Sequence, residues 1–98
     1  MNEHKAQDRI VHEASPTHGV FFIEREGTRV AELTYQRGPK FATIDHTWVD
    51  DAMRGTGAGR RLVDAAVAWA RTEQVKLRPV CSFARAVLQR VPEYSDVL

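Results

Sequence analysis

The feature that most constrains this chain is a run of three glycines at alternate positions, Gly55, Gly57 and Gly59, within the segment RGTGAGRRLV. The residues before it, 41–49, have the β-branched and aromatic composition of a strand. The residues after it repeat apolar side chains at the spacing of a half-buried helix, which we expect from Ala58 to Glu73. The sequence therefore predicts a strand, a tight glycine turn and a helix in direct succession.

Four strands are predicted before this turn, separated by short clusters of turn residues. They are expected over residues 9–14, 20–25, 28–37 and 41–49. Connections this short favour an antiparallel meander. After the helix, residues 75–81 are predicted to form a fifth strand, and a last helix from Phe83 to Arg90 is expected to be capped by Ser82. Because strand, helix and strand in succession need a crossover, we expect an α+β fold that ends in a parallel β-α-β unit and a C-terminal helix.

Length and composition restrict the class of protein. A chain of 98 residues indicates a single domain, 1–98, and its polar start, 1–8, is expected to be frayed. The single cysteine excludes an internal disulfide. The chain has neither an apolar signal segment at its start nor an apolar run long enough to cross a bilayer. We therefore expect a cytoplasmic protein with no membrane partner.

Charge is distributed unevenly along the chain. Residues 1–53 carry 6 basic and 9 acidic side chains, whereas residues 54–98 carry 8 and 4. A basic half that begins at the glycine turn suits an anionic small ligand, although a chance division at that boundary is an equal alternative. No dense cluster of lysine and arginine is present, so a nucleic-acid partner is not expected.

The glycine turn has the chemistry of an anion site. Amides in the first turn of a helix have no partners within the helix, and the helix dipole adds partial positive charge there. A Walker loop is rejected because Gly59 is followed by Arg60 and Arg61 rather than by lysine and a hydroxyl residue. A dinucleotide fingerprint is rejected because the spacing is G-x-G-x-G after antiparallel strands. The remaining pattern is Arg/Gln-x-x-Gly-x-Gly/Ala, which residues 54–59 match.

This pattern resembles the acetyl-CoA pyrophosphate loop of the GNAT superfamily of N-acetyltransferases. Together with His46-Thr47, PVCSF at 79–83 and PEY at 92–94, it is similar to the minimal GNAT-like (YjdJ-type) family over about residues 9–98. The resemblance implies a minimal GNAT-like fold that lacks the first two GNAT helices, because only residues 15–19 stand where those helices usually lie. It also implies acetyl-CoA as co-substrate and an amine or protein acceptor of unknown identity.

The resemblance assigns roles to particular residues. Val49 would pair its backbone with the pantetheine amides in a gap where the fourth and fifth strands splay apart. Arg60 or Arg61 would add charge near the phosphates. The pyrophosphate would be held by the backbone amides of the loop, namely Arg54, Gly55, Thr56, Gly57, Ala58 and Gly59.

Two residues are candidates for catalysis, and each has a structural alternative. Cys81 precedes a predicted helix, a position that favours the thiolate. The resemblance implies that it lies near the CoA thioester, so it is a candidate to take the acetyl group; the alternative is a small buried apolar residue. His46 is a candidate to accept a proton; the alternative is a packed histidine bonded to a neighbouring strand. Relatives often carry tyrosine, the usual proton donor, where this chain has Val87. Histidine and cysteine spacing indicates no metal site.

The predicted function is transfer of an acetyl group from acetyl-CoA to an amine. The alternative is a non-catalytic module that binds CoA or acyl-CoA, or one that binds another protein. Trp48 and Trp69 are expected in the core.

Overall fold

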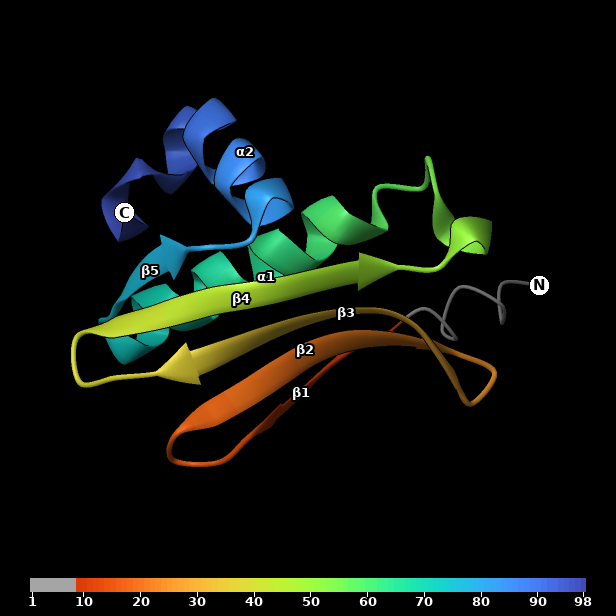
Figure 1. Cartoon of the computed structure of the whole chain (residues 1–98), viewed down its shortest axis with the longest axis horizontal. Helices are drawn as coiled ribbons and strands as arrows, with labels where there is room; N and C mark the ends of the chain where they lie inside the picture. The colour runs from red at the N-terminus through yellow and green to blue at the C-terminus, as the bar shows by residue number, and fades with distance from the viewer. Residues whose placement is uncertain (1–8) are drawn as a thin grey trace.

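The computed structural model of the protein describes residues 9–98, so the predicted frayed start, 1–8, lies outside the described residues. The chain forms one five-stranded sheet, two α-helices and two short 3-10 helices (Figure 1). The strands are β1 (Arg9–Ala14), β2 (His18–Arg25), β3 (Thr28–Arg37), β4 (Phe41–Val49) and β5 (Lys76–Pro79). The helices are η2 (Asp51–Met53), α1 (Ala58–Glu73), α2 (Ser82–Arg90) and η3 (Pro92–Val97).

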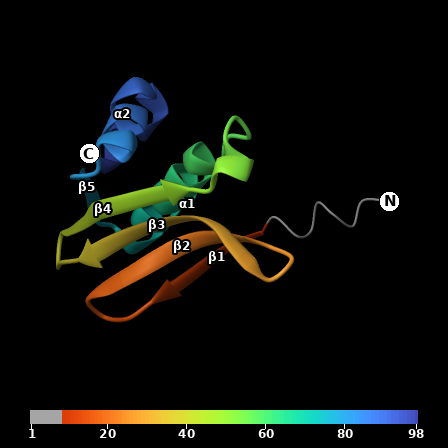
Figure 2. The same cartoon turned by 45° about the vertical axis from the view of Figure 1, so that its right-hand side comes forward.

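The strands lie in the sheet in the order of the chain. β1 to β4 form an antiparallel meander, and β5 pairs in parallel with β4 at the opposite edge from β1. α1 carries the chain from β4 to β5 and packs on one face of the sheet against β2, β3 and β4 (Figures 1 and 2). These observations confirm the predicted α+β class, the meander, the β-α-β unit and the C-terminal helix. Only residues 15–17 connect β1 with β2, as expected for a fold without the two early helices.

The core lies between α1 and the face of the sheet that it covers. Alternation along β3 buries Ala31, Leu33 and Tyr35 toward the helix, while α1 buries a stripe that includes Leu62 and Val67. Each large apolar side chain of this kind stabilises the fold by about 1.5–3 kcal/mol relative to exposure. The other face of the sheet carries polar side chains, and within residues 9–98 no helix packs on it. We call it the open face, and it includes Glu32, Thr34, Gln36, Asp45 and His46.

β5 is shorter than the predicted strand 75–81. Its pairing with β4 ends at Ile44 and Pro79. Beyond that point the amides of Val80 and Cys81 both donate to the carbonyl oxygen of Ile44, at 3.0 and 3.1 Å. Because two successive amides donate to the same carbonyl oxygen, the ladder of hydrogen bonds with β4 ends here. The chain leaves the sheet at this point.

Three further predictions are wrong in detail. β2 begins at His18 rather than residue 20, because Gly19 pairs with both Ala14 and Tyr35. Glycine is needed there because a Cβ would lie 2.3 Å from the Tyr35 hydroxyl. Ser82 is the first residue of α2 and not its cap, which is Cys81. Trp48 is 39% exposed, whereas Trp69 packs against the core as predicted. The helix η3 was not predicted.

Candidate functional site

The sheet opens between β4 and β5 halfway along β4. At this point the register between β3 and β4 also shifts, because Tyr35 pairs with Ile44 and Thr34 with His46, which leaves Asp45 as an extra residue. Such a bulge reverses the direction of the side chains and peptide groups that follow it. The amide of Asp50 donates to Val30 of β3 at 2.9 Å, so alternation turns the peptide groups of residues 47 and 49 toward the gap that β5 leaves.

A tight turn leads from β4 to α1. Asp50 caps η2 by accepting a hydrogen bond from the amide of Ala52 at 3.0 Å. The hydroxyl of Thr56 donates to the carbonyl oxygen of Met53 at 2.5 Å, and its amide donates to the same oxygen at 3.2 Å. Thr56 therefore serves the shape of the turn, and its side chain is already engaged.

Two of the three glycines are required by backbone conformation. Gly55 and Gly57 have φ angles of +78° and +83°, and no atom lies within 4 Å of the position of a Cβ on either. Only glycine adopts this left-handed region without strain. The space beside both residues is open, so a ligand can approach the backbone closely.

The N-terminus of α1 presents free donors to this open space. Gly57 is the N-cap, and the first bond of the helix runs from the amide of Arg61 to the carbonyl oxygen of Gly57 at 2.9 Å. Within residues 9–98 the amides of Ala58, Gly59 and Arg60 donate to no backbone carbonyl. Helix α1 has 16 residues and no acidic side chain in its first turn, so the dipole at this end is not neutralised locally. Backbone amides in this arrangement are able to bind an anion.

A cavity of about 530 Å³ runs from this turn to the gap between the strands. It brings together most of the predicted ligand-binding residues, although Thr56 is not among its lining. It also brings in residues that were not predicted as site residues, from β4, η2 and α2. The lining consists of Thr47, Val49, Met53, Arg54, Gly55, Gly57, Ala58, Gly59, Arg60, Phe83, Val87 and Arg90.

The helix α2 forms the wall opposite the glycine turn. Phe83, Val87 and Arg90 follow the spacing i, i+4 and i+7, so they lie on one face of the helix. A Cβ on Gly59 would lie 2.6 Å from the Phe83 ring, so the third glycine allows the two helices to approach each other. The helical spacing in SFARAVLQR was the available signal for this wall, but it does not identify which other element the face meets.

A larger hollow of about 720 Å³ lies elsewhere, over the turn between β1 and β2 and the adjacent open face. Its lining includes Glu13 and Asp45, and it contains neither the glycine turn nor the N-terminus of a helix. We therefore regard the smaller cavity as the candidate site for an anionic ligand.

Cys81 does not line this cavity, but it contacts Thr47, which does. Its Sγ donates to Thr47 Oγ1 at 3.4 Å, and the thiol is partly buried. Burial opposes ionisation of this thiol, but the Thr47 hydroxyl and the nearby backbone groups of Ala84, Phe83 and Thr47 favour the thiolate, and the net result is a lowered pKa. The neutral thiol makes no capping hydrogen bond to α2. A cysteine with a lowered pKa therefore lies next to the cavity.

His46 does not line the cavity. Its Nε2 lies 3.5 Å from Glu32 Oε2, and its side chain is 53% exposed. Glu32 alternates along β3 with Ala31 and Leu33, which face α1, so His46 lies on the open face. The structure thus places the two predicted catalytic residues on opposite faces of β4.

No group of three or more His, Cys, Asp or Glu side chains within residues 9–98 is arranged to hold a metal ion. None of the helices in this range is long and apolar enough to span a bilayer.

Comparisons with known proteins agree on one family. The sequence profile of the GCN5-related N-acetyl-transferases matches residues 20–97. The solution structure of a GCN5-like protein from Staphylococcus aureus is 34% identical and superposes with a TM-score of 0.70, covering 94% of this chain and 88% of that one. A search of curated proteins found no significant match.

Larger enzymes share the fold at lower identity. The ribosomal-protein-S18-alanine N-acetyltransferase from Escherichia coli is 18% identical with a TM-score of 0.68, and the alignment covers 94% of this chain but 59% of that one. The aminoglycoside N-acetyltransferase AAC(6')-Iy, solved in complex with CoA, is 12% identical with a TM-score of 0.59, covering 81% and 59%.

Proposed function

The chain belongs to the GCN5-related N-acetyltransferase family, and from this premise we propose that it transfers an acetyl group from acetyl-CoA to an amine. One observation carries the proposal: a single cavity joins the free amides at the N-terminus of α1 to Thr47, whose hydroxyl contacts the Cys81 thiol. The acceptors in the names of the two larger enzymes, a protein alanine and an aminoglycoside, fit an amine as the acceptor class.

Acetyl-CoA would lie along this cavity with its phosphates at the glycine turn. The amides of residues 58–60 would hold the pyrophosphate, and Arg54 and Arg60 would supply positive charge. The peptide groups of Thr47 and Val49, which face the gap, would pair with the pantetheine amides as an added strand does. The thioester would then lie beside Cys81.

Cys81 would act as a nucleophile in the first step. Its thiolate attacks the acetyl carbonyl carbon, the new carbon–sulfur bond forms, and the bond to the CoA sulfur breaks. This exchange consumes one thiolate and releases another, so it does not require a proton donor. The apolar Val87 on the wall of α2 is compatible with such a step, because this position offers no hydroxyl to protonate a leaving group.

In the second step the amine attacks S-acetyl-Cys81 and the carbon–nitrogen bond forms while the Cys81 thiolate departs. The Thr47 hydroxyl and the amides at the start of α2 stabilise this departing thiolate by the same contacts that lower its pKa. The attacking amine must lose a proton. His46, paired with Glu32 on the open face, would receive the proton of an acceptor that approaches from that side.

The test combines intact-mass measurement with turnover. Incubation with acetyl-CoA should add one acetyl group to the wild type and none to Cys81→Ala, and free CoA should add nothing. Cys81→Ala should also lose most turnover toward an amine panel, whereas His46→Ala should lose turnover but retain the acetylated cysteine. An unmodified wild type that still turns over, with Cys81→Ala equally active, would exclude the covalent route.

The second candidate function is a non-catalytic acyl-CoA-binding module. Val87, which places no proton donor in the wall of the cavity, is the observation that favours it. Binding of acetyl-CoA with no turnover above the rate without protein would establish this alternative, and faster turnover by wild type than by Cys81→Ala or His46→Ala would exclude it. A titration followed by amide NMR, with shifts at Gly55, Gly57, Gly59 and Val49, would report binding in both cases.

A further inference from the structure

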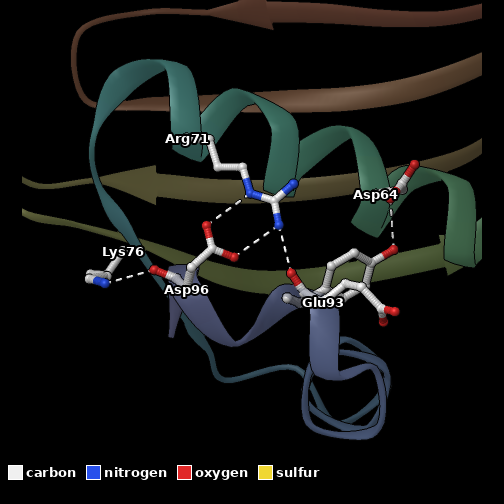
Figure 3. Close-up of polar contacts among 6 residues, drawn as sticks. Asp64, Arg71, Lys76, Glu93 and Asp96 are labelled. Carbon is white, nitrogen blue, oxygen red and sulfur yellow. Dashed lines mark hydrogen bonds and ion pairs between the residues drawn. The ribbon is translucent and has the colours of Figure 1, made fainter.

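The helix η3 lies beside α1 and is tied to it at two places (Figure 3). At the C-terminal end of α1, Arg71 donates from Nε and Nη2 to the two carboxylate oxygens of Asp96, both at 2.9 Å. Its Nη2 also donates to the carbonyl oxygen of Glu93 at 2.6 Å, and Lys76 Nζ donates to the carbonyl oxygen of Asp96 at 2.7 Å. These contacts are remote from the glycine turn.

The second tie lies near the N-terminus of α1. The ring of Tyr94 is buried, with 4% of the residue exposed. Its hydroxyl donates to Asp64 Oδ1 at 2.8 Å (Figure 3) and accepts a hydrogen bond from Arg60 Nε at 3.2 Å. The Arg60 guanidinium carbon also lies 5.6 Å from the centre of the Tyr94 ring. Tyr94 therefore bridges two residues that are one turn apart on α1.

The contact with Nε has a geometric consequence for the cavity. Nε is the inner nitrogen of the planar guanidinium, so a bond to it restrains the plane of the group and leaves the terminal nitrogens for other acceptors. Arg60 lines the cavity beside Gly59. Arg54, in contrast, has a side chain that is 76% exposed and pairs with Asp51 in the preceding turn. Of these two arginines, Arg60 is the one held by a buried side chain.

We infer that Tyr94 is a positioning residue for phosphate binding: it orients Arg60 so that the terminal nitrogens of the guanidinium face the pyrophosphate at the glycine turn. This rests on the proposed function, because the pyrophosphate is that of CoA. A side chain that is oriented before the ligand arrives loses less conformational entropy on binding, and this raises affinity. The inference also gives the C-terminal segment a role in ligand binding, although Tyr94 does not itself line the cavity.

Tyr94→Phe is the informative variant because it keeps the buried ring and removes only the hydroxyl. Its Kd for CoA should rise by about three- to tenfold, which is the size of effect expected for one ordinary hydrogen bond. Arg60→Gln should weaken CoA at least as much, and adding Tyr94→Phe to it should have little further effect, since the hydroxyl acts through Arg60. The Kd for dephospho-CoA, which keeps the pyrophosphate, should rise in Tyr94→Phe by the same factor as the Kd for CoA.

Asp96→Ala is the matched control. It removes the Arg71–Asp96 ion pair from the other tie between η3 and α1, so it should lower stability while leaving the Kd for CoA within about twofold of wild type. An unchanged Kd for CoA in Tyr94→Phe would overturn the inference, and so would an equal rise of that Kd in Asp96→Ala. A rise in Tyr94→Phe that is seen with CoA but not with dephospho-CoA would also overturn it. If the wild type bound no CoA, the proposed function would fail, and this inference with it.

Discussion

The glycine turn has two roles: it starts α1, and it exposes the first amides of that helix. The Gly57→Ala variant allows these two roles to be measured separately. Gly57 has φ +83° and ψ 12°, and nothing lies within 4 Å of the position of the new Cβ. The methyl group therefore meets no steric conflict with other side chains, and the cost comes from the backbone alone. A left-handed non-glycine residue costs about 1–2 kcal/mol.

Part of this cost is offset because alanine also restricts the unfolded chain, which is worth about 0.4–1 kcal/mol. We therefore expect a net loss of about 1 kcal/mol, which corresponds to a fall in Tm of about 4–8 °C for a domain of this size. Gly57→Asn should lose less, because asparagine enters the left-handed region more readily than alanine.

Thermal unfolding and CoA titration must be measured together on the same variants. If the turn keeps its shape, the strain appears as lost stability and the affinity for CoA is retained. If the backbone relaxes instead, stability recovers but the amides of α1 move and the affinity falls. If Gly57→Ala had both the Tm and the CoA affinity of wild type, neither the stability of the turn nor the binding of CoA would depend on the positive φ of residue 57.

Other predictions concern the wall of the cavity and two titrating groups. Gly59→Ala should displace the ring of Phe83, which lies 2.6 Å from the new Cβ, and weaken acetyl-CoA binding with a smaller effect on Tm than Gly57→Ala; the opposite order would contradict this. Thr47→Val should raise the pKa of Cys81, so the pH midpoint of iodoacetamide alkylation should move upward; an unchanged midpoint would show that the hydroxyl has no effect. Burial, partly opposed by Glu73, lowers the pKa of His12, so the unfolded chain binds the proton first as the pH falls below about 6.5. Urea unfolding should therefore show stability declining from neutral toward acidic pH down to the folded-state pKa of His12, and less so in His12→Gln.

Elements determined by local chemistry were predicted well. The helix α1 begins at Ala58 and ends at Glu73 as expected, because its apolar period and its glycine start are both local. The strands β1, β3 and β4 also have the predicted bounds, since each lies between turn residues. The glycine turn was predicted as an anion site, and the free amides of α1 are present there.

The sequence did not predict which residues of β4 face α1, because a single extra residue interrupts the alternation along this strand. The buried residues Ala42 and Ile44 occupy even positions, whereas Thr47 and Val49, which line the cavity, occupy odd ones. The change falls at Asp45, where the bulge lies. A shift of one residue exchanges the two faces of a strand, and it explains why Trp48 is exposed.

The amino-acid sequence alone was sufficient to predict the order of the elements and the glycine turn that begins α1. Both follow from periodicity and from glycine conformation, which involve neighbouring residues only. The tertiary structure alone decided which side chains complete the site. Phe83 and Val87 reach the cavity because α2 packs beside α1, and Tyr94 meets Arg60 because η3 lies beside the same helix. These partners are separated by more than a helix length of chain, and only the packing of a shared core brings them together.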